Sequence, residues 1–79
     1  GDIYALKATL LKEIRRQNLQ EFSVLDVGAG SGEILREIAK FSRKENRKAK
    51  LFGLEYNELS AKSISYESKD FQEISAVRG

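Results

Sequence analysis

The most constraining feature of this sequence is a short apolar segment that runs directly into a cluster of glycines. Val24, Leu25 and Val27 form the apolar segment, and Gly28–Gly32 follows with the sequence Gly-Ala-Gly-Ser-Gly. Aliphatic and β-branched residues in so short a run are typical of a buried parallel strand. Glycines at this spacing relieve the restrictions on φ and remove side chains that would keep a ligand from the backbone. The segment therefore predicts a strand followed by a turn that a ligand can approach closely.

The rest of the chain alternates between helical and strand patterns. The predicted elements are a helix at about 3–17 with Asp2 as its N-cap, a strand at about 23–27, a helix that ends near Arg43 or Lys44, a strand from Lys50 to Tyr56, a helix that Asn57 caps and that ends near Lys69, and a strand from Ile74 to Val77. Such alternation favours parallel βαβ units with right-handed crossovers. We predict an α/β fold in which a Rossmann-like open parallel sheet has flanking helices, in the order αβαβαβ.

Length and composition narrow the classes of protein. The 79 residues fit one small domain, with a leading helix and connection at 1–22 and a βαβαβ core at 23–79. Without Cys or His there is no zinc site built on those ligands, and we predict no metal site. No apolar run approaches the roughly 20 residues of a membrane helix. The lack of Cys and of a signal peptide favours the cytoplasm, and the absence of an initial Met favours a processed chain or a piece of a longer one.

The charges give little support for nucleic-acid binding. Fourteen Lys and Arg against twelve Asp and Glu leave a net charge of +2. The most basic stretch, Arg36–Lys50, falls at the end of a predicted helix and in the return loop, at the edge of the sheet away from the ligand side. We therefore interpret it as a solvated segment and not as an anion-binding patch.

A carboxylate stands at the end of the second predicted strand. In a parallel sheet the loops after Val27 and Leu54 emerge at the same edge, and adjacent strands lie about 4.8 Å apart. Glu55 is thus placed to accept hydrogen bonds from both hydroxyls of a ribose whose nucleoside touches the glycine loop. Tyr56 is either a ring that lies against a base or an ordinary core aromatic, and the pattern leaves both open.

The acidic residues around the glycines indicate which nucleoside cofactor fits. Glu33 stands where a dinucleotide fingerprint has its third glycine, and its charge would repel a pyrophosphate at the start of the helix. Asp26 lies within the apolar strand, where an unpaired carboxylate costs on the order of several kcal/mol, so we expect it to face backbone amides or the ligand. S-adenosylmethionine has no phosphate and a net positive charge, which suits Asp26, Glu33 and Glu55 together.

The segment Leu25–Gly32 resembles the first motif of the class I S-adenosylmethionine-dependent methyltransferases. The resemblance extends over about 23–79 and implies S-adenosyl-L-methionine as the cofactor. It also implies the residues that bind it: Gly28, Ala29 and Gly30 at the methionine moiety, Asp26 at its amino group, Gly32 in the same turn, Glu55 at the ribose hydroxyls and Tyr56 against the adenine.

The resemblance implies a seven-stranded fold of which this chain is the N-terminal, cofactor-binding half. The family's acidic residue after the third strand and its acceptor-binding segments would lie past Gly79. We therefore predict a methyltransferase part that does not turn over alone, since methyl transfer relies on holding the acceptor in line with the methyl group. The methyl acceptor and the catalytic residues stay unidentified.

Two alternatives belong to other classes of protein. One is an oxidoreductase that binds a nicotinamide cofactor. The other is a non-catalytic scaffold with a Rossmann-like fold, suggested by the exposed third strand, through which the chain would self-associate.

Overall fold

The computed structural model describes residues 3–79 and has the predicted order of elements. These are α1 (Ile3–Arg16), β1 (Glu21–Val27), α2 (Glu33–Lys44), β2 (Lys48–Glu55), α3 (Glu58–Glu67) and β3 (Ile74–Arg78). The first two strands each begin two residues earlier than predicted, and α3 ends two residues earlier than predicted. The predicted N-cap Asp2 lies outside the described residues.

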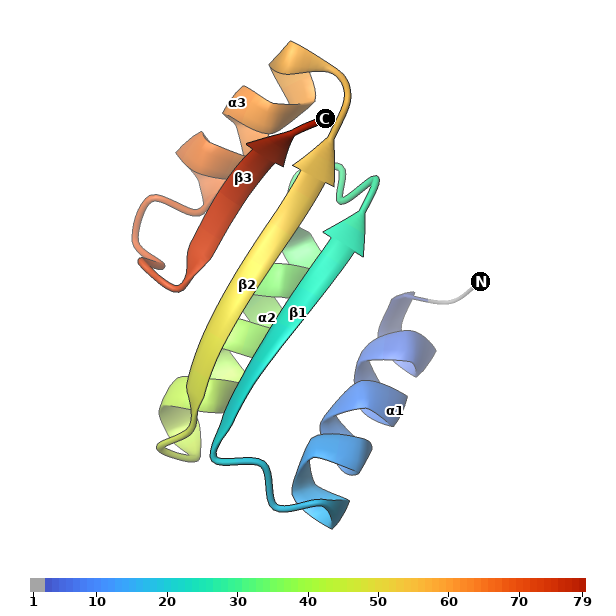
Figure 1. Ribbon diagram of the computed structural model, residues 1–79, viewed down its shortest axis with the longest axis vertical. Coiled ribbons are helices and arrows are strands. Elements are labelled where there is room, and N and C mark those ends of the chain that lie inside the picture. The colour runs from blue at the N-terminus through green and yellow to red at the C-terminus, as the bar shows by residue number, and fades with distance from the viewer. Residues whose placement is uncertain (1–2) are drawn as a thin grey trace.

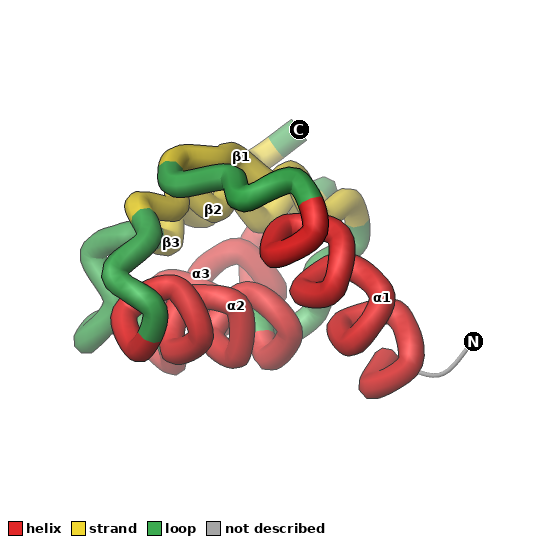
Figure 2. The backbone as a smooth tube through the Cα atoms, turned by 90° about the horizontal axis from the view of Figure 1, so that it is seen from below, coloured by secondary structure: helices red, strands yellow, loops and turns green. Residues whose placement is uncertain are grey.

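The three strands form one parallel sheet in the order β1-β2-β3, as Figure 1 shows. In the register, Val24 lies beside Leu51, and Leu51 lies beside Ile74. A sheet that grows in one direction through right-handed crossovers places the successive crossover helices on one face. Figure 2 shows this arrangement, with the helices gathered beneath the sheet. The predicted Rossmann-like αβαβαβ fold is confirmed.

The core lies between the sheet and α2. Leu35, Ile38 and Ala39 of α2 are almost completely buried and pack with Ala49 and Leu51 of β2. Full burial of an aliphatic side chain of this size contributes roughly 1.5–3 kcal/mol. The buried side chains of α2 therefore hold the helix against the centre of the sheet and fix the position of its first turn.

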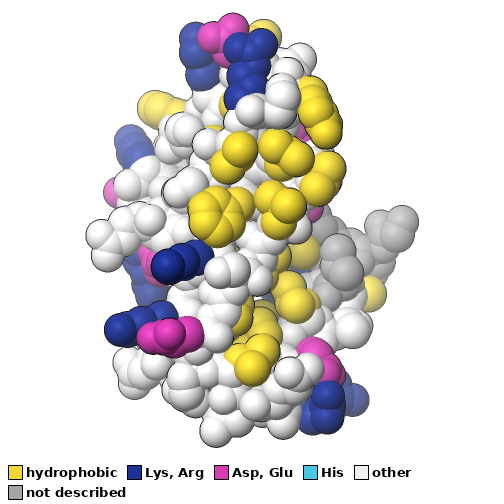
Figure 3. Space-filling model, in the orientation of Figure 1, with side chains coloured by type: hydrophobic (Ala, Val, Ile, Leu, Met, Phe, Trp, Pro, Cys, Tyr) yellow, Lys and Arg dark blue, Asp and Glu magenta, His cyan; other side chains and the backbone are white. Residues whose placement is uncertain are grey.

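The opposite face of the sheet has no helix over it in residues 3–79. Leu25 and Val27 are 59% and 60% exposed, and Val77 is 41% exposed. Apolar side chains gather over the strands on this face in Figure 3. The prediction of a buried first strand was wrong for this face, because all three helices lie on the other one. None of the helices in the described chain is both long and apolar enough to cross a bilayer.

Arginines of the basic segment connect the elements at their far ends. Arg43 makes an ion pair with Glu73 at 2.7 Å and lies over the ring of Phe71. The Arg47 side chain is only 10% exposed and donates a hydrogen bond to the carbonyl oxygen of Leu19 at 3.0 Å. The interpretation of this segment as solvated was wrong for Arg47, since a guanidinium can satisfy several carbonyl and carboxylate acceptors at once.

Candidate functional site

The glycine loop follows β1 at the carboxyl edge of the sheet and has one open side. The N–H of Gly28 donates to the carbonyl oxygen of Leu54 at 2.8 Å, which ties the loop to β2. Gly28 and Gly30 have φ values of 70° and 62°, a region that costs other residues roughly 1–2 kcal/mol. A Cβ built on either glycine would meet no heavy atom of the described chain within 4 Å, apart from the neighbouring residues. Both positions therefore border open space.

The other side of the loop is packed against the core. Gly32 is buried, and a Cβ there would lie 3.3 Å from Cγ2 of Ile64. Gly53 in β2 lies beneath the loop, where a Cβ would be 3.1 Å from side-chain atoms of Ile64 and Leu35 and 3.2 Å from Cβ of Ala29. Gly53 was not among the predicted site residues. Its signal was an isolated glycine within a strand pattern, which indicates the close approach of a neighbouring segment.

Glu55 joins the second strand to the glycine loop. It is the last residue of β2, and its Oε1 accepts a hydrogen bond from the N–H of Gly30 at 2.9 Å. The loops after β1 and β2 therefore meet at one edge of the sheet, and the predicted proximity of Glu55 to the glycines is confirmed. No donor reaches the second carboxylate oxygen, Oε2, within residues 3–79.

Asp26 is half-buried beside a small apolar cavity. The cavity has a volume of about 190 Å³ and lies where Leu10 of α1 and Ile34 of α2 approach β1. Burial raises the pKa of the Asp26 carboxyl, and the nearby Glu55 carboxylate raises it further. No backbone amide in residues 3–79 donates to Asp26, so of the two alternatives that we expected, backbone amides or the ligand, the ligand stays as the prediction. A carboxylate in this environment would be stabilised by a nearby cation.

The two helices that begin at this edge have different N-termini. Asn57 caps α3, because its Oδ1 accepts from the N–H groups of Leu59 and Ser60 at 2.8 and 3.3 Å. This predicted cap is confirmed. Gly32 occupies the N-cap position of α2 and provides no side-chain acceptor. The first N–H groups of α2 thus face the glycine loop without a side-chain cap.

Tyr56 and Arg36 are two further residues near the loop. Tyr56 is 68% exposed, which excludes the interpretation as an ordinary core aromatic. A Cβ on Gly79 would lie 2.7 Å from the Tyr56 ring, so the end of β3 lies close beside it. On the packed side, Nη1 of Arg36 donates to the carbonyl oxygen of Ser31 at 2.6 Å and to the Ser68 hydroxyl at 3.3 Å. These hydrogen bonds of Arg36 connect the loop to the end of α3.

Comparisons with known proteins add a structural likeness. No family model and no curated protein sequence matches the chain. Among solved structures, it is similar to coclaurine N-methyltransferase crystallised with N-methylheliamine and SAH, with a TM-score of 0.64 and 19% sequence identity. The match covers 92% of this chain and 22% of that protein, so this chain spans about a fifth of the length of its structural relative. At this identity the likeness shows the fold.

Proposed function

We propose that this chain is the cofactor-binding part of an S-adenosylmethionine-dependent methyltransferase. The observation that carries the proposal is the open side of the glycine loop next to Glu55. Gly28 and Gly30 adopt backbone conformations that favour glycine. No contact in the described chain requires a side chain to be absent at these two positions. Space left beside a carboxylate at the carboxyl edge of a parallel sheet is where ligands of open α/β folds bind. The likeness to a methyltransferase crystallised with SAH supports this choice.

The residues present suit the chemistry of this cofactor. The Oε2 atom of Glu55 keeps its acceptor capacity for the ribose hydroxyls, while Oε1 holds Gly30 in place. The carboxylate of Asp26 would support the amino group of the methionine moiety, alongside the backbone of Gly28, Ala29 and Gly30. The exposed ring of Tyr56 offers a flat apolar surface to the adenine.

Charge favours a cationic adenosyl compound over a dinucleotide. Glu33 in the first turn of α2, together with Asp26 and Glu55, gives the opening of the loop a negative charge. A pyrophosphate that approached the uncapped N–H groups of α2 would meet the Glu33 carboxylate as well. A ligand with a sulfonium and an ammonium group gains from the same charges.

In this function the residues of the protein would bind and orient the cofactor. The cofactor would supply a methyl group that its sulfonium activates. The glycine loop and Glu55 would hold the adenosyl and methionine parts at the carboxyl edge, with Asp26 close to the positive charges. Methyl transfer also requires an acceptor held in line with the methyl group. We assign no acceptor-binding residue or general base here, and we propose that the 79-residue chain binds the cofactor without turning it over.

Isothermal titration calorimetry with S-adenosylhomocysteine tests the proposal. We expect heat of binding for the chain and a loss of affinity of about tenfold in Glu55→Gln, which keeps an acceptor for Gly30 but loses the charge. Glu67→Gln at the end of α3 is the matched control and should bind as the parent chain does. Absence of heat up to millimolar ligand, or stronger stabilisation by NAD⁺ than by S-adenosylhomocysteine, would overturn the proposal.

A further inference from the structure

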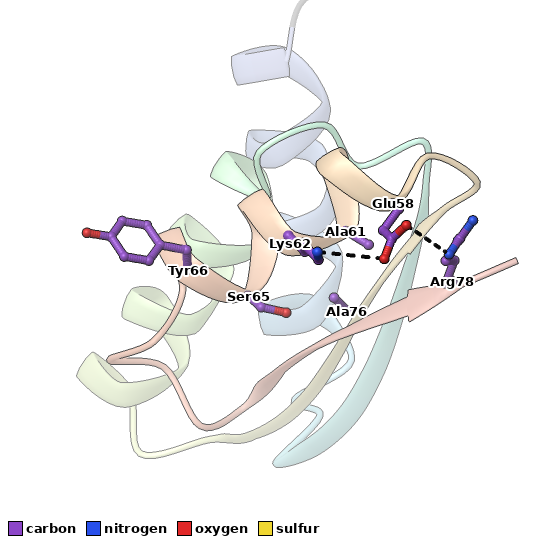
Figure 4. A pocket seen from close by; sticks show the side chains of 7 residues that line it. All are labelled: Glu58, Ala61, Lys62, Ser65, Tyr66, Ala76 and Arg78. Atoms are coloured by element: carbon purple, nitrogen blue, oxygen red, sulfur yellow. Dashed lines mark ion pairs between the residues drawn. The ribbon is translucent and has the colours of Figure 1, made fainter.

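A shallow groove runs between α3 and β3, and no residue of the glycine loop lines it. Its volume is about 520 Å³, and Figure 4 shows the side chains that line it. Ala61 and Ser65 of α3 and Ala76 of β3 are small, so that the helix and the strand are separated by an accessible channel. The lining residues of α3 recur at three- and four-residue spacing and therefore share one side of the helix.

The strand that borders this groove has a free edge. In the part of the chain that the structure describes, β3 (Ile74–Arg78) pairs with β2 alone and ends the sheet. Along such an edge, backbone N–H and C=O groups are available to another extended segment. Strand addition at an edge, with side chains entering an adjacent groove, is a recurrent way in which proteins bind peptides.

The side chains that line the groove include more cations than carboxylates. Glu58 lies 3.7 Å from Nζ of Lys62 and 3.6 Å from Nη1 of Arg78, as the dashed lines in Figure 4 mark. One carboxylate is thus shared by two cations, and both separations exceed hydrogen-bond length. At the other end, Lys69 lies over the ring of Tyr66, 4.9 Å from its centroid. Three charged side chains line the groove, and two of them are cations, Lys62 and Arg78, which keep donors for a further acceptor.

We propose that this groove binds an extended acidic peptide segment, which joins β3 as a further strand and places a carboxylate between Lys62 and Arg78. The charges decide against a second copy of this chain as the occupant. Two copies joined through β3 would bring together two grooves that are each net positive, and like charges across an interface are unfavourable. An acidic segment supplies the second carboxylate that the two cations lack.

A nuclear magnetic resonance titration of the ¹⁵N-labelled chain tests this inference. The probe is an acetylated, amidated heptapeptide of sequence Thr-Val-Glu-Val-Glu-Val-Thr, and the control peptide has Gln in place of both Glu. We expect the acidic peptide to shift amide signals of β3 and of the groove side of α3, and the Gln peptide to bind more weakly. The double variant Lys62→Glu with Arg78→Glu should weaken binding by about tenfold or more.

The matched control carries the same charge change elsewhere. Lys12 and Lys50 are exposed and do not line the groove, so Lys12→Glu with Lys50→Glu should keep most of the affinity. Equal binding of both peptides, equal losses in the two double variants, or shifts confined to residues outside α3 and β3 would overturn the proposal. Sedimentation equilibrium of the chain alone gives a further test, because a dimer that Lys62→Glu with Arg78→Glu disrupts would assign the groove to a second copy.

Discussion

Two pairs of glycines at the same edge of the sheet have opposite surroundings. Gly28 and Gly30 face open space, whereas Gly32 and Gly53 are buried against side chains of the core. Positive φ does not distinguish the pairs, because Gly32 has it as well as Gly28 and Gly30. The packed pair lets α2, α3 and β2 approach one another. The open pair has no such role, since nothing in the described chain occupies the space beside it. The comparison separates glycines that serve the fold from glycines whose surroundings suit a ligand.

We expect the largest effect on stability from a substitution at the buried Gly53. Gly53→Val would place branched carbon atoms against Leu35 and Ile64, which are fully buried and cannot move into solvent. Overpacking of this kind costs typically 1–3 kcal/mol, and we expect about 3 kcal/mol here. Urea unfolding followed by circular dichroism measures it. Gly53→Ala should lose less, and equal stability of Gly53→Val and the parent chain would contradict the packed role.

On the open side, a substitution should affect binding more than stability. Gly30→Ala adds a methyl group that would meet no heavy atom of the described chain within 4 Å apart from the neighbouring residues. Because alanine would have to adopt the unfavourable φ of this position, we expect a stability loss of about 1 kcal/mol. The same methyl group would enter the proposed cofactor space, and the affinity for S-adenosylhomocysteine should fall by about tenfold or more. Unchanged affinity in calorimetry would contradict the claim that the cofactor occupies the space beside Gly30.

Asp26→Asn should separate stability from binding. Burial and Glu55 raise the pKa of Asp26, so the folded chain disfavours the ionised form. The stabilisation linked to this group is complete below the unfolded pKa of about 4 and is lost as pH rises through the folded pKa. At pH 7 the variant should therefore melt at a higher temperature than the parent chain. It should also bind S-adenosylmethionine more weakly, because it lacks the negative charge near the ligand.

Thermal melts at several pH values check the stability part. The advantage of Asp26→Asn should shrink as pH falls toward 4 and the parent carboxyl becomes protonated. An advantage that is independent of pH would assign the effect to packing. A variant that is less stable than the parent chain at pH 7 would contradict the raised pKa.

The smallest effect is expected at the end of the sheet away from the glycines. The hydrogen bond from Arg43 lowers the pKa of Glu73, so its contribution to stability is present above the unfolded pKa and lost as pH falls through the folded pKa. Glu73→Gln should cost up to about 1 kcal/mol at pH 7 and less in acid. Ligand affinity should not change. A loss of affinity would show that the two ends of the sheet are coupled.

The sequence predicted the parts of this structure that depend on local pattern. The order of elements followed from periodicity, and the cap at Asn57 followed from its position before a helical pattern. The meeting of Glu55 with the glycine loop followed from parallel topology, because the carboxyl ends of parallel strands share one edge.

Features that depend on three-dimensional packing were not predicted. The apolar pattern around Leu25 does not distinguish a strand covered on both faces from one covered on a single face. The burial of Arg47 depends on the carbonyl group of Leu19, which is distant in sequence. The different roles of Gly28 and Gly53 depend on which side chains surround a missing Cβ, and composition contains no such information.

The most direct test of the central claim is a ¹H–¹⁵N correlation spectrum of the 79-residue chain titrated with S-adenosylhomocysteine. We predict the largest shifts at the amides of Gly28, Gly30, Glu55 and Tyr56, with Ser65 and Tyr66 of α3 shifting little. A spectrum that does not change, or in which the shifts lie on the face of the sheet away from the helices and not at the glycine loop, would contradict the assignment of this edge as a cofactor site.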